Sequence, residues 1–162
     1  MDKPTIYIGI PKWPWKHFML ARANNDQYRI DIDPAGLAHE CSRHRELLDL
    51  FDRDVTDFKE TEYYIYQLRN KRSVKQINEK IQGFKKLYES IRRFGCIVPP
   101  VVTTDGCRLD GSHRSSILVH LKMPTATVNL ARYEEHFDHE TCKAIREQVK
   151  DFRRSYYGLD PV

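Results

Sequence analysis

Apolar residues recur at helical spacing in two long segments of the chain. The first stripe has steps of 4, 3, 4 and 3 and consists of Ile77, Ile81, Phe84, Tyr88 and Ile91. Gly95 follows it, at the position where helices commonly end. The second stripe has steps of 3, 4, 3 and 4 and consists of Cys142, Ile145, Val149, Phe152 and Tyr156. These stripes predict a helix that stops at Gly95 and a C-terminal helix between the cap residue Asp138 and Gly158.

The first 33 residues have the pattern of a β-rich, irregular segment. The stretches 18–23 and 28–32 flank Asn24-Asn25-Asp26, which favours a turn, so a hairpin is predicted there. Asp33-Pro34 combines a cap residue with a first-turn proline and predicts a helix that extends to about Phe51. We expect the buried side of this helix to carry Leu47, Leu48 and Phe51.

The remaining segments predict short elements of both kinds. A short helix is expected around residues 62–68. The stretches 101–103 and 107–109 bracket Thr104-Asp105-Gly106 and predict a tight hairpin. A helix from about His113 to Lys122 and a β-branched strand over 125–130 follow. The pattern predicts the α/β (α+β) class, with a small mixed sheet and three or four helices.

A chain of 162 residues is long enough for one domain core and short for two. We expect a single domain in which residues 56–135 form the core, residues 1–55 form an extension packed on it, and residues 136–162 add a C-terminal helix.

The composition describes an ordinary globular protein, with 40% hydrophobic and 31% charged residues. Its 27 Lys and Arg against 23 Asp and Glu leave a net charge of +4, which suits an anionic ligand such as a nucleotide without proving nucleic-acid binding. No apolar run approaches the ~20 residues of a membrane helix, and the N-terminus lacks a secretory signal, so a cytoplasmic location is expected. The four scattered cysteines are expected to be free thiols.

The segment 110–116 carries the strongest chemical signal, because a predicted strand leads through a glycine turn directly into a helix. The first amides of a helix lack internal partners and favour anions. We therefore expect a phosphate to contact Gly111, Ser112, His113, Arg114, Ser115 and Ser116. Asp110 is a candidate ligand of Mg²⁺, and His113 a candidate donor to a phosphoryl oxygen. The alternative is purely local: Ser112 is an N-cap and Asp110-Gly111 a turn.

Three sequence boxes in this order resemble the ParB/sulfiredoxin superfamily. They are the helix end at 88–95, the Pro-Pro-Val-Val stretch at 99–102, and the Leu-Asp-Gly-Ser-His-Arg stretch at 109–114. The resemblance covers roughly residues 60–130, and in that superfamily the Gly-x-x-Arg turn binds nucleotide phosphates. Sulfiredoxins carry a reactive cysteine where this chain has Ser112, which argues against their chemistry. Partition proteins bind CTP and need a downstream helix-turn-helix, whereas one amphipathic helix is expected after Leu130.

The free-serine-kinase-like branch is the most similar at the motif, with Asp110-Gly111-Ser112-His113-Arg114 matching its box except at the middle residue. The resemblance implies ATP or ADP as phosphate donor, Mg²⁺ as cofactor with Asp110 beside it, and Glu62 or Glu60 as the base that accepts a hydroxyl proton. The predicted function is phosphate transfer to a hydroxyl of a small metabolite or glycan. A non-catalytic module that binds nucleotide or contacts DNA is the main alternative, and a nuclease is a third. The acceptor, the choice among ATP, ADP and CTP, and the oligomeric state stay open.

Other clusters are more simply explained by packing and solvation. The basic residues between 69 and 93 are interspersed with Glu79 and Glu89 and are typical of a solvated helix face, with polyanion contact as the alternative. His39, Cys41 and His44 cannot all point to one ion from a single helix. His136, His139 and Cys142 step by three but lack a fourth metal ligand. Aromatic residues suited to packing or to stacking on a base or sugar are Trp13, Trp15, Tyr63, Tyr64 and Tyr66.

Overall fold

The computed structural model describes residues 19–20, 28–33, 42–105 and 108–157, with side chains up to residue 151. Within these ranges the protein has the mixed α+β class that the sequence predicts. The elements, in chain order, are β1 (Arg29–Ile32), α2 (Ser42–Asp52), α3 (Glu62–Arg69), α4 (Val74–Phe94), β2 (Val101–Thr103), β3 (Arg108–Asp110), α5 (Ser112–His120), β4 (Ala126–Ala131), a 3₁₀ turn (Tyr133–Glu135) and α6 (His139–Tyr157).

The four strands form one mixed sheet in the order β1-β4-β2-β3. β1 pairs antiparallel with β4, β4 pairs parallel with β2, and β2 pairs antiparallel with β3. The β2–β3 pairing confirms the predicted hairpin, although residues 106–107 of its turn lie outside the described residues. Since β3 stands at one end of the strand order and runs straight into α5, the motif at 110–116 lies at the border of the sheet.

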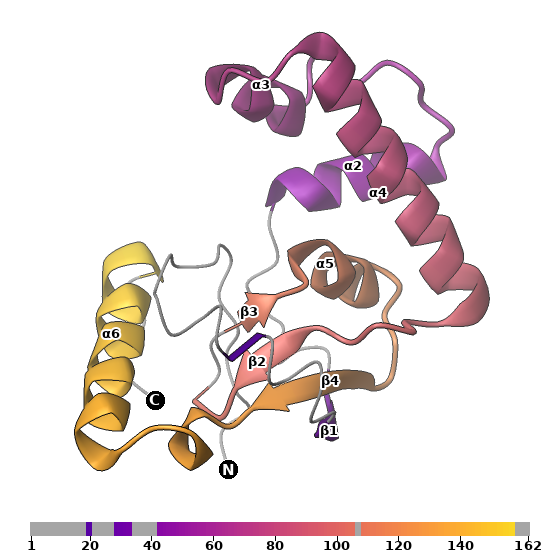
Figure 1. Cartoon of the computed structure of the whole chain (residues 1–162). Coiled ribbons are helices and arrows are strands. Elements are labelled where there is room, and N and C mark those ends of the chain that lie inside the picture. Colours follow the sequence, from indigo (N-terminus) through magenta and orange to yellow (C-terminus); the bar gives the residue numbers. More distant parts are fainter. Residues whose placement is uncertain (1–18, 21–27, 34–41, 106–107, 158–162) are drawn as a thin grey trace.

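The two faces of the sheet support two separate apolar clusters. Side chains alternate along a strand, so Val102 and Val128 face one way and Val101 and Leu109 the other. The first cluster joins the sheet to α2, α3, α4 and α5, and the second joins it to α6 through Cys142, Ile145 and Val149. Figure 1 shows the same division, with α6 on one side of the sheet and the other helices on the opposite side.

The longest described helix, α4, has the C-terminal end and the buried face that the sequence predicts. Ser73 and Gln76 form a capping box at its start, and Gly95 ends it with a φ of 82°, a left-handed region that favours glycine. The five residues of the stripe are all at most 5% exposed. Residues 62–68 are also helical as predicted, and α6 begins after Asp138, whose carboxylate accepts the Thr141 amide.

Two expectations about elements need correction. Met19 and Leu20 are helical, and the described partner of β1 is β4, so the local hairpin over 18–32 is wrong at these residues. The long-range pairing sets Ile30 beside the fully buried Val128, and this apolar contact outweighs the local turn signal. The described residues also hold five α-helices, more than the three or four expected.

One further expectation extends beyond what the structure describes. The predicted helix start at Asp33-Pro34 falls on residues 34–41, which lie outside the described residues. Among the helices that the structure describes, none combines the length and the apolar character needed to cross a bilayer.

Candidate functional site

The turn between β3 and α5 requires glycine at position 111. Gly111 has a φ of 97° and a ψ of 36°, and a Cβ built there would lie 2.9 Å from the Cα and Cβ of Pro100. The Asp110 carboxylate accepts the Gly111 amide at 2.8 Å and closes the turn. Gly111 is also the N-cap of α5, without a side-chain hydrogen bond to the helix start, so the local alternative in which Ser112 is the N-cap is wrong.

Arg114 braces this turn against the preceding loop. Its Nη2 lies 3.1 Å from Oδ2 of Asp110, and its Nη1 donates to the carbonyls of Val98 at 2.9 Å and Pro99 at 3.2 Å. The Asp110 side chain stays 49% exposed, whereas that of Arg114 is 16% exposed. The predicted phosphate ligand Arg114 therefore holds the loop and Asp110 in place, and its positive charge remains beside the first turn of α5.

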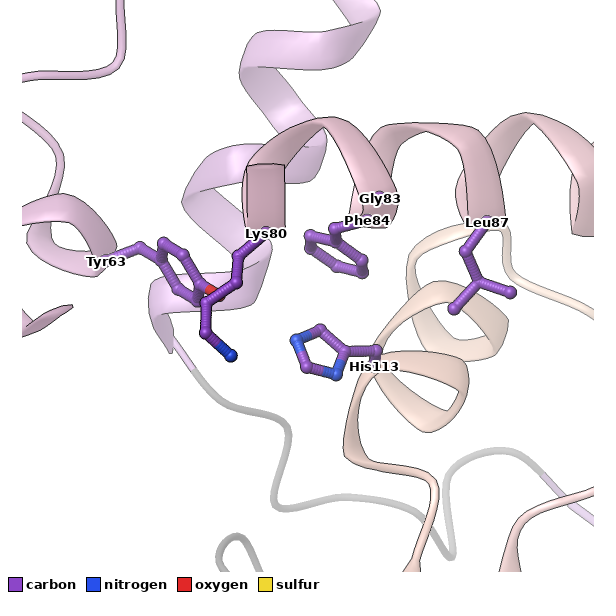
Figure 2. A pocket seen from close by; sticks show the side chains of 6 residues that line it. All are labelled: Tyr63, Lys80, Gly83, Phe84, Leu87 and His113. Carbon is purple, nitrogen blue, oxygen red and sulfur yellow. The ribbon is translucent and has the colours of Figure 1, made fainter. Parts of the chain in front are cut away.

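A cavity of about 220 Å³ lies next to this turn, between α4 and the start of α5. Figure 2 shows the Lys80 ammonium and the His113 imidazole pointing toward one another across it. Among the described residues that line it, Lys80 carries the one charged side chain; these residues are Tyr63, Lys80, Gly83, Phe84, Leu87 and His113. The cavity thus combines one positive charge, one imidazole and an apolar wall.

His113 is neutral at pH 7 in this environment. Burial lowers its pKa to about 4, helped by the positive charges of Lys80, Arg108 and Arg114 and opposed by Asp110. A neutral imidazole offers one N–H donor and one acceptor nitrogen. His113 can therefore donate a hydrogen bond to a phosphoryl oxygen while the positive charge in the cavity comes from Lys80.

A second histidine, His44 of α2, lies behind His113. The two rings stack with their centroids 4.3 Å apart and their planes inclined by 28°. His44 is 7% exposed, and burial, followed by the charges of His113, Arg108 and Arg43, lowers its pKa to about 3. The sequence singled out His44 only as a poor metal ligand, because nothing in the chain order indicates that α2 and α5 come together.

The three serines of the motif differ in exposure. Ser115 and Ser116 are each 1% exposed, so their hydroxyls face the interior of the protein. The Ser116 hydroxyl donates to the carbonyl of Ser112 at 2.9 Å and lies 3.2 Å from Nδ1 of His44. Ser112 is partly exposed, at the beginning of the helix. Of the three, Ser112 is therefore the one whose side chain reaches the surface beside the uncapped amides.

The predicted bases Glu60 and Glu62 line a different hollow, of about 400 Å³, at α2 and α3. Its other lining residues are Arg43, Glu46, Ile65, Tyr66 and Arg69. Glu62 lies 3.5 Å from the Ser42 hydroxyl, and its amide donates to Glu46 at 3.0 Å. Neither carboxylate lines the cavity of His113, although Tyr63, the residue after Glu62 in α3, does.

The metal-ligand candidates do not converge in the part of the chain that is described. No group of three or more His, Cys, Asp or Glu side chains within it is arranged to hold a metal ion, which includes His136, His139 and Cys142. His39 and Cys41 lie outside the described residues. Asp110 as a single carboxylate would need phosphate oxygens and water to complete the coordination of Mg²⁺.

Comparison of the chain with protein families, with curated proteins and with solved structures found no match.

Proposed function

We propose that this protein binds a nucleotide between α4 and the start of α5 and transfers phosphate from ATP or ADP to a hydroxyl group. The observation that carries the proposal is the cavity in which Lys80 and the neutral His113 face each other beside the uncapped start of α5. The motif at 110–114, which resembles the ParB/sulfiredoxin superfamily, lies at this helix start and supports the same ligand class.

The phosphate end of the ligand is supported by three kinds of donor. The first amides of α5 have no side-chain cap, and the partial positive charge of a helix N-terminus favours an anion. Lys80 supplies a full positive charge from α4, and His113 supplies a neutral N–H. An anion here would be held from two helices, which fixes its position better than one helix end would.

The other end of the cavity suits the nucleoside. Lys80, Gly83 and Leu87 follow one face of α4, and seven residues of helix extend over about 10 Å at ~1.5 Å per residue. The polarity changes along this face, from an ammonium to an exposed helix backbone and then to leucine. A ligand with an anionic head and a flat apolar tail matches this order. At about 220 Å³, the cavity encloses part of such a molecule and leaves the rest at the surface.

In the transfer step, the carboxylates of Asp110, Glu60 and Glu62 would have different roles. Asp110 is half-exposed beside the turn, where it would bind Mg²⁺ together with phosphate oxygens, and the ion would offset charge on the transferred group. The acceptor would occupy the hollow of Glu60 and Glu62, with one carboxylate taking the hydroxyl proton as the oxygen attacks phosphorus. Arg43, Tyr66 and Arg69 in the same hollow would bind a polar acceptor such as a small metabolite or glycan end.

A second candidate function is nucleotide binding without transfer. The observation that favours it is that Glu60 and Glu62 line another hollow than His113 does. A chain that senses nucleotide needs the cavity alone, whereas a kinase must bring an acceptor hydroxyl from the hollow of Glu62 to the phosphate.

Nucleotide binding is tested first, by calorimetry with ADP, ATP and CTP in the presence and absence of Mg²⁺. Lys80→Ala is expected to weaken binding about tenfold or more, because it removes the charge opposite His113. Lys86→Ala is the matched control, as an exposed lysine of the same helix that does not line the cavity. An equal loss in both variants would mean that a diffuse basic face, and not this cavity, binds the anion.

Phosphate transfer is tested by measuring the release of ADP from ATP, or of AMP from ADP, in the presence of pools of hydroxyl-bearing acceptors. Asp110→Asn and Glu62→Gln are expected to reduce turnover far more than nucleotide affinity. If nucleotide raises the melting temperature while no acceptor stimulates turnover, the protein is the binding module and not the kinase.

A further inference from the structure

We infer that His44 is a positioning residue of the nucleotide cavity, which holds the imidazole of His113 toward Lys80. The inference rests on the proposed function, since it concerns the residue that would donate to the phosphate. His44 does not line the cavity itself. It acts from α2, a helix that lies outside the region of the family resemblance.

The ring of His113 packs against two other rings, which also pack against each other. The face of His44 stacks on it at 4.3 Å, and Phe84 meets it edge-on at 4.9 Å with an angle of 66°. His44 also lies 5.2 Å from Phe84 and 6.0 Å from Tyr63, so it contacts three of the residues that form the cavity wall. A ring that is stacked on one neighbour and meets a second edge-on keeps its orientation before the ligand arrives, which lowers the entropy cost of binding.

The orientation of His44 is itself fixed by a hydrogen bond to Ser116. The Ser116 hydroxyl bonds to the carbonyl of Ser112 at 2.9 Å. The same oxygen lies 3.2 Å from Nδ1 of His44, within hydrogen-bond distance. Ser116, which the motif offered as a phosphate ligand, instead anchors the residue behind His113.

The surroundings of His44 require the neutral form. Positive or ionisable groups face it from three elements, namely Arg43 of its own helix, Arg108 of β3 and His113 of α5, while α3 and α4 contribute the rings of Tyr63 and Phe84. A positive charge on His44 would be repelled by these groups, and burial would keep water from weakening that repulsion. The pair of stacked histidines thus stays uncharged and leaves Lys80 as the charge that meets the ligand.

A double-mutant cycle tests the inference, with ADP affinity measured by calorimetry for His44→Ala, His113→Ala and the double variant. A residue that acts through His113 has nothing left to position once His113 is gone. We expect His44→Ala alone to weaken ADP binding about tenfold and to cause no further loss in the His113→Ala background. Equal losses in both backgrounds would overturn the inference.

Two substitutions that fill the space of the His44 ring distinguish a positioning role from simple packing. His44→Phe keeps a flat ring against His113, whereas His44→Leu fills the space without one. We expect the phenylalanine variant to retain more ADP affinity than the leucine variant at matched thermal stability, and equal affinities would contradict the stacking role. If the wild type itself binds no nucleotide, the proposed function fails. If the wild type binds and the cycle is additive, only the role of His44 fails.

Discussion

The hydroxyl of Tyr88 donates a hydrogen bond of 2.5 Å to the carboxylate of Asp52, which ties the end of α2 to the middle of α4. The other oxygen of the same carboxylate lies 2.8 Å from Nε2 of His120, at the last residue of α5. Asp52 therefore joins three helices whose other parts contribute to the cavity of His113 and to the histidine pair behind it. A change at Asp52 should reach the cavity through helix packing, and not through direct contact.

Tyr88→Phe is expected to lower the free energy of unfolding by about 1 kcal/mol at pH 7, because it removes a bond to a partly exposed carboxylate. Burial acts to raise the pKa of Asp52, but the bonds from Tyr88 and His120 outweigh it and lower the pKa below its ordinary value of 3.8. The ionised form therefore stabilises the fold above that value, and this stability is lost as pH falls through the lowered pKa. Urea denaturation should show a difference between variant and wild type at pH 7, and this difference should shrink as the pH is lowered within the range in which both stay folded.

The histidine pair predicts loss of stability in mild acid. The pKa of His44 is about 3 and that of His113 about 4, against 6.5 for an ordinary histidine, so the unfolded chain binds more protons between these values. The free energy of unfolding therefore rises with pH across this range. When the pH is lowered from 7 to 5, it decreases by about 2 kcal/mol for each histidine. The midpoints of urea denaturation, determined from pH 4.5 to 7.5, measure this pH dependence. His113→Phe should flatten the slope by about one proton, and an unchanged slope would contradict the assignment.

Substitution of Gly83 by alanine is expected to have opposite effects on the stability of the protein and on ADP binding. A glycine inside a helix costs about 1 kcal/mol relative to alanine, and a Cβ at Gly83 would meet nothing within 4 Å. Gly83→Ala should therefore stabilise the free protein by about 1 kcal/mol and weaken ADP binding, because the new methyl group enters the cavity wall. Ser90→Ala, at an exposed position of α4 outside the cavity, is the control and should leave ADP binding unchanged. Unchanged ADP affinity in the Gly83 variant would exclude ligand contact with this stretch of α4.

Local patterns in the sequence predict the helices well and the site in part. The stripe of α4 could be recognised because all its members lie in one segment and face one core. The turn at Gly111 could be recognised because glycine, a strand end and a helix start are adjacent in the chain. Both signals are short-range, so no knowledge of the tertiary structure was needed.

The cavity itself could not be predicted, since its residues come from α3, α4 and α5 and have no common spacing. Lys80 resembles the other lysines of a basic helix until the structure sets it opposite His113. His44 and Ser116 are 72 positions apart, and only the packing of α2 on α5 makes them partners. The same holds for β1, whose pairing with β4 depends on a strand near the other end of the chain.

Ser115 and Ser116 form a matched pair for the last prediction, because both are 1% exposed and adjacent in α5. The Ser116 hydroxyl bonds to Ser112 and His44, whereas the Ser115 hydroxyl is buried and has no hydrogen-bond partner among the described residues. Ser116→Ala removes the hydrogen-bond partner of Nδ1 of the buried His44 and should destabilise the fold by about 1–3 kcal/mol. Ser115→Ala removes a polar group that is desolvated without compensation, so it should leave stability unchanged or raise it slightly.

Chemical denaturation at pH 7.5 compares the two serine variants under conditions in which both histidines are neutral. In the His44→Leu background, Ser116→Ala should cost much less stability, since the imidazole nitrogen that lost its partner is then absent. A similar loss of stability in both serine variants would mean that packing of the first turn of α5, and not the bond to His44, makes position 116 sensitive.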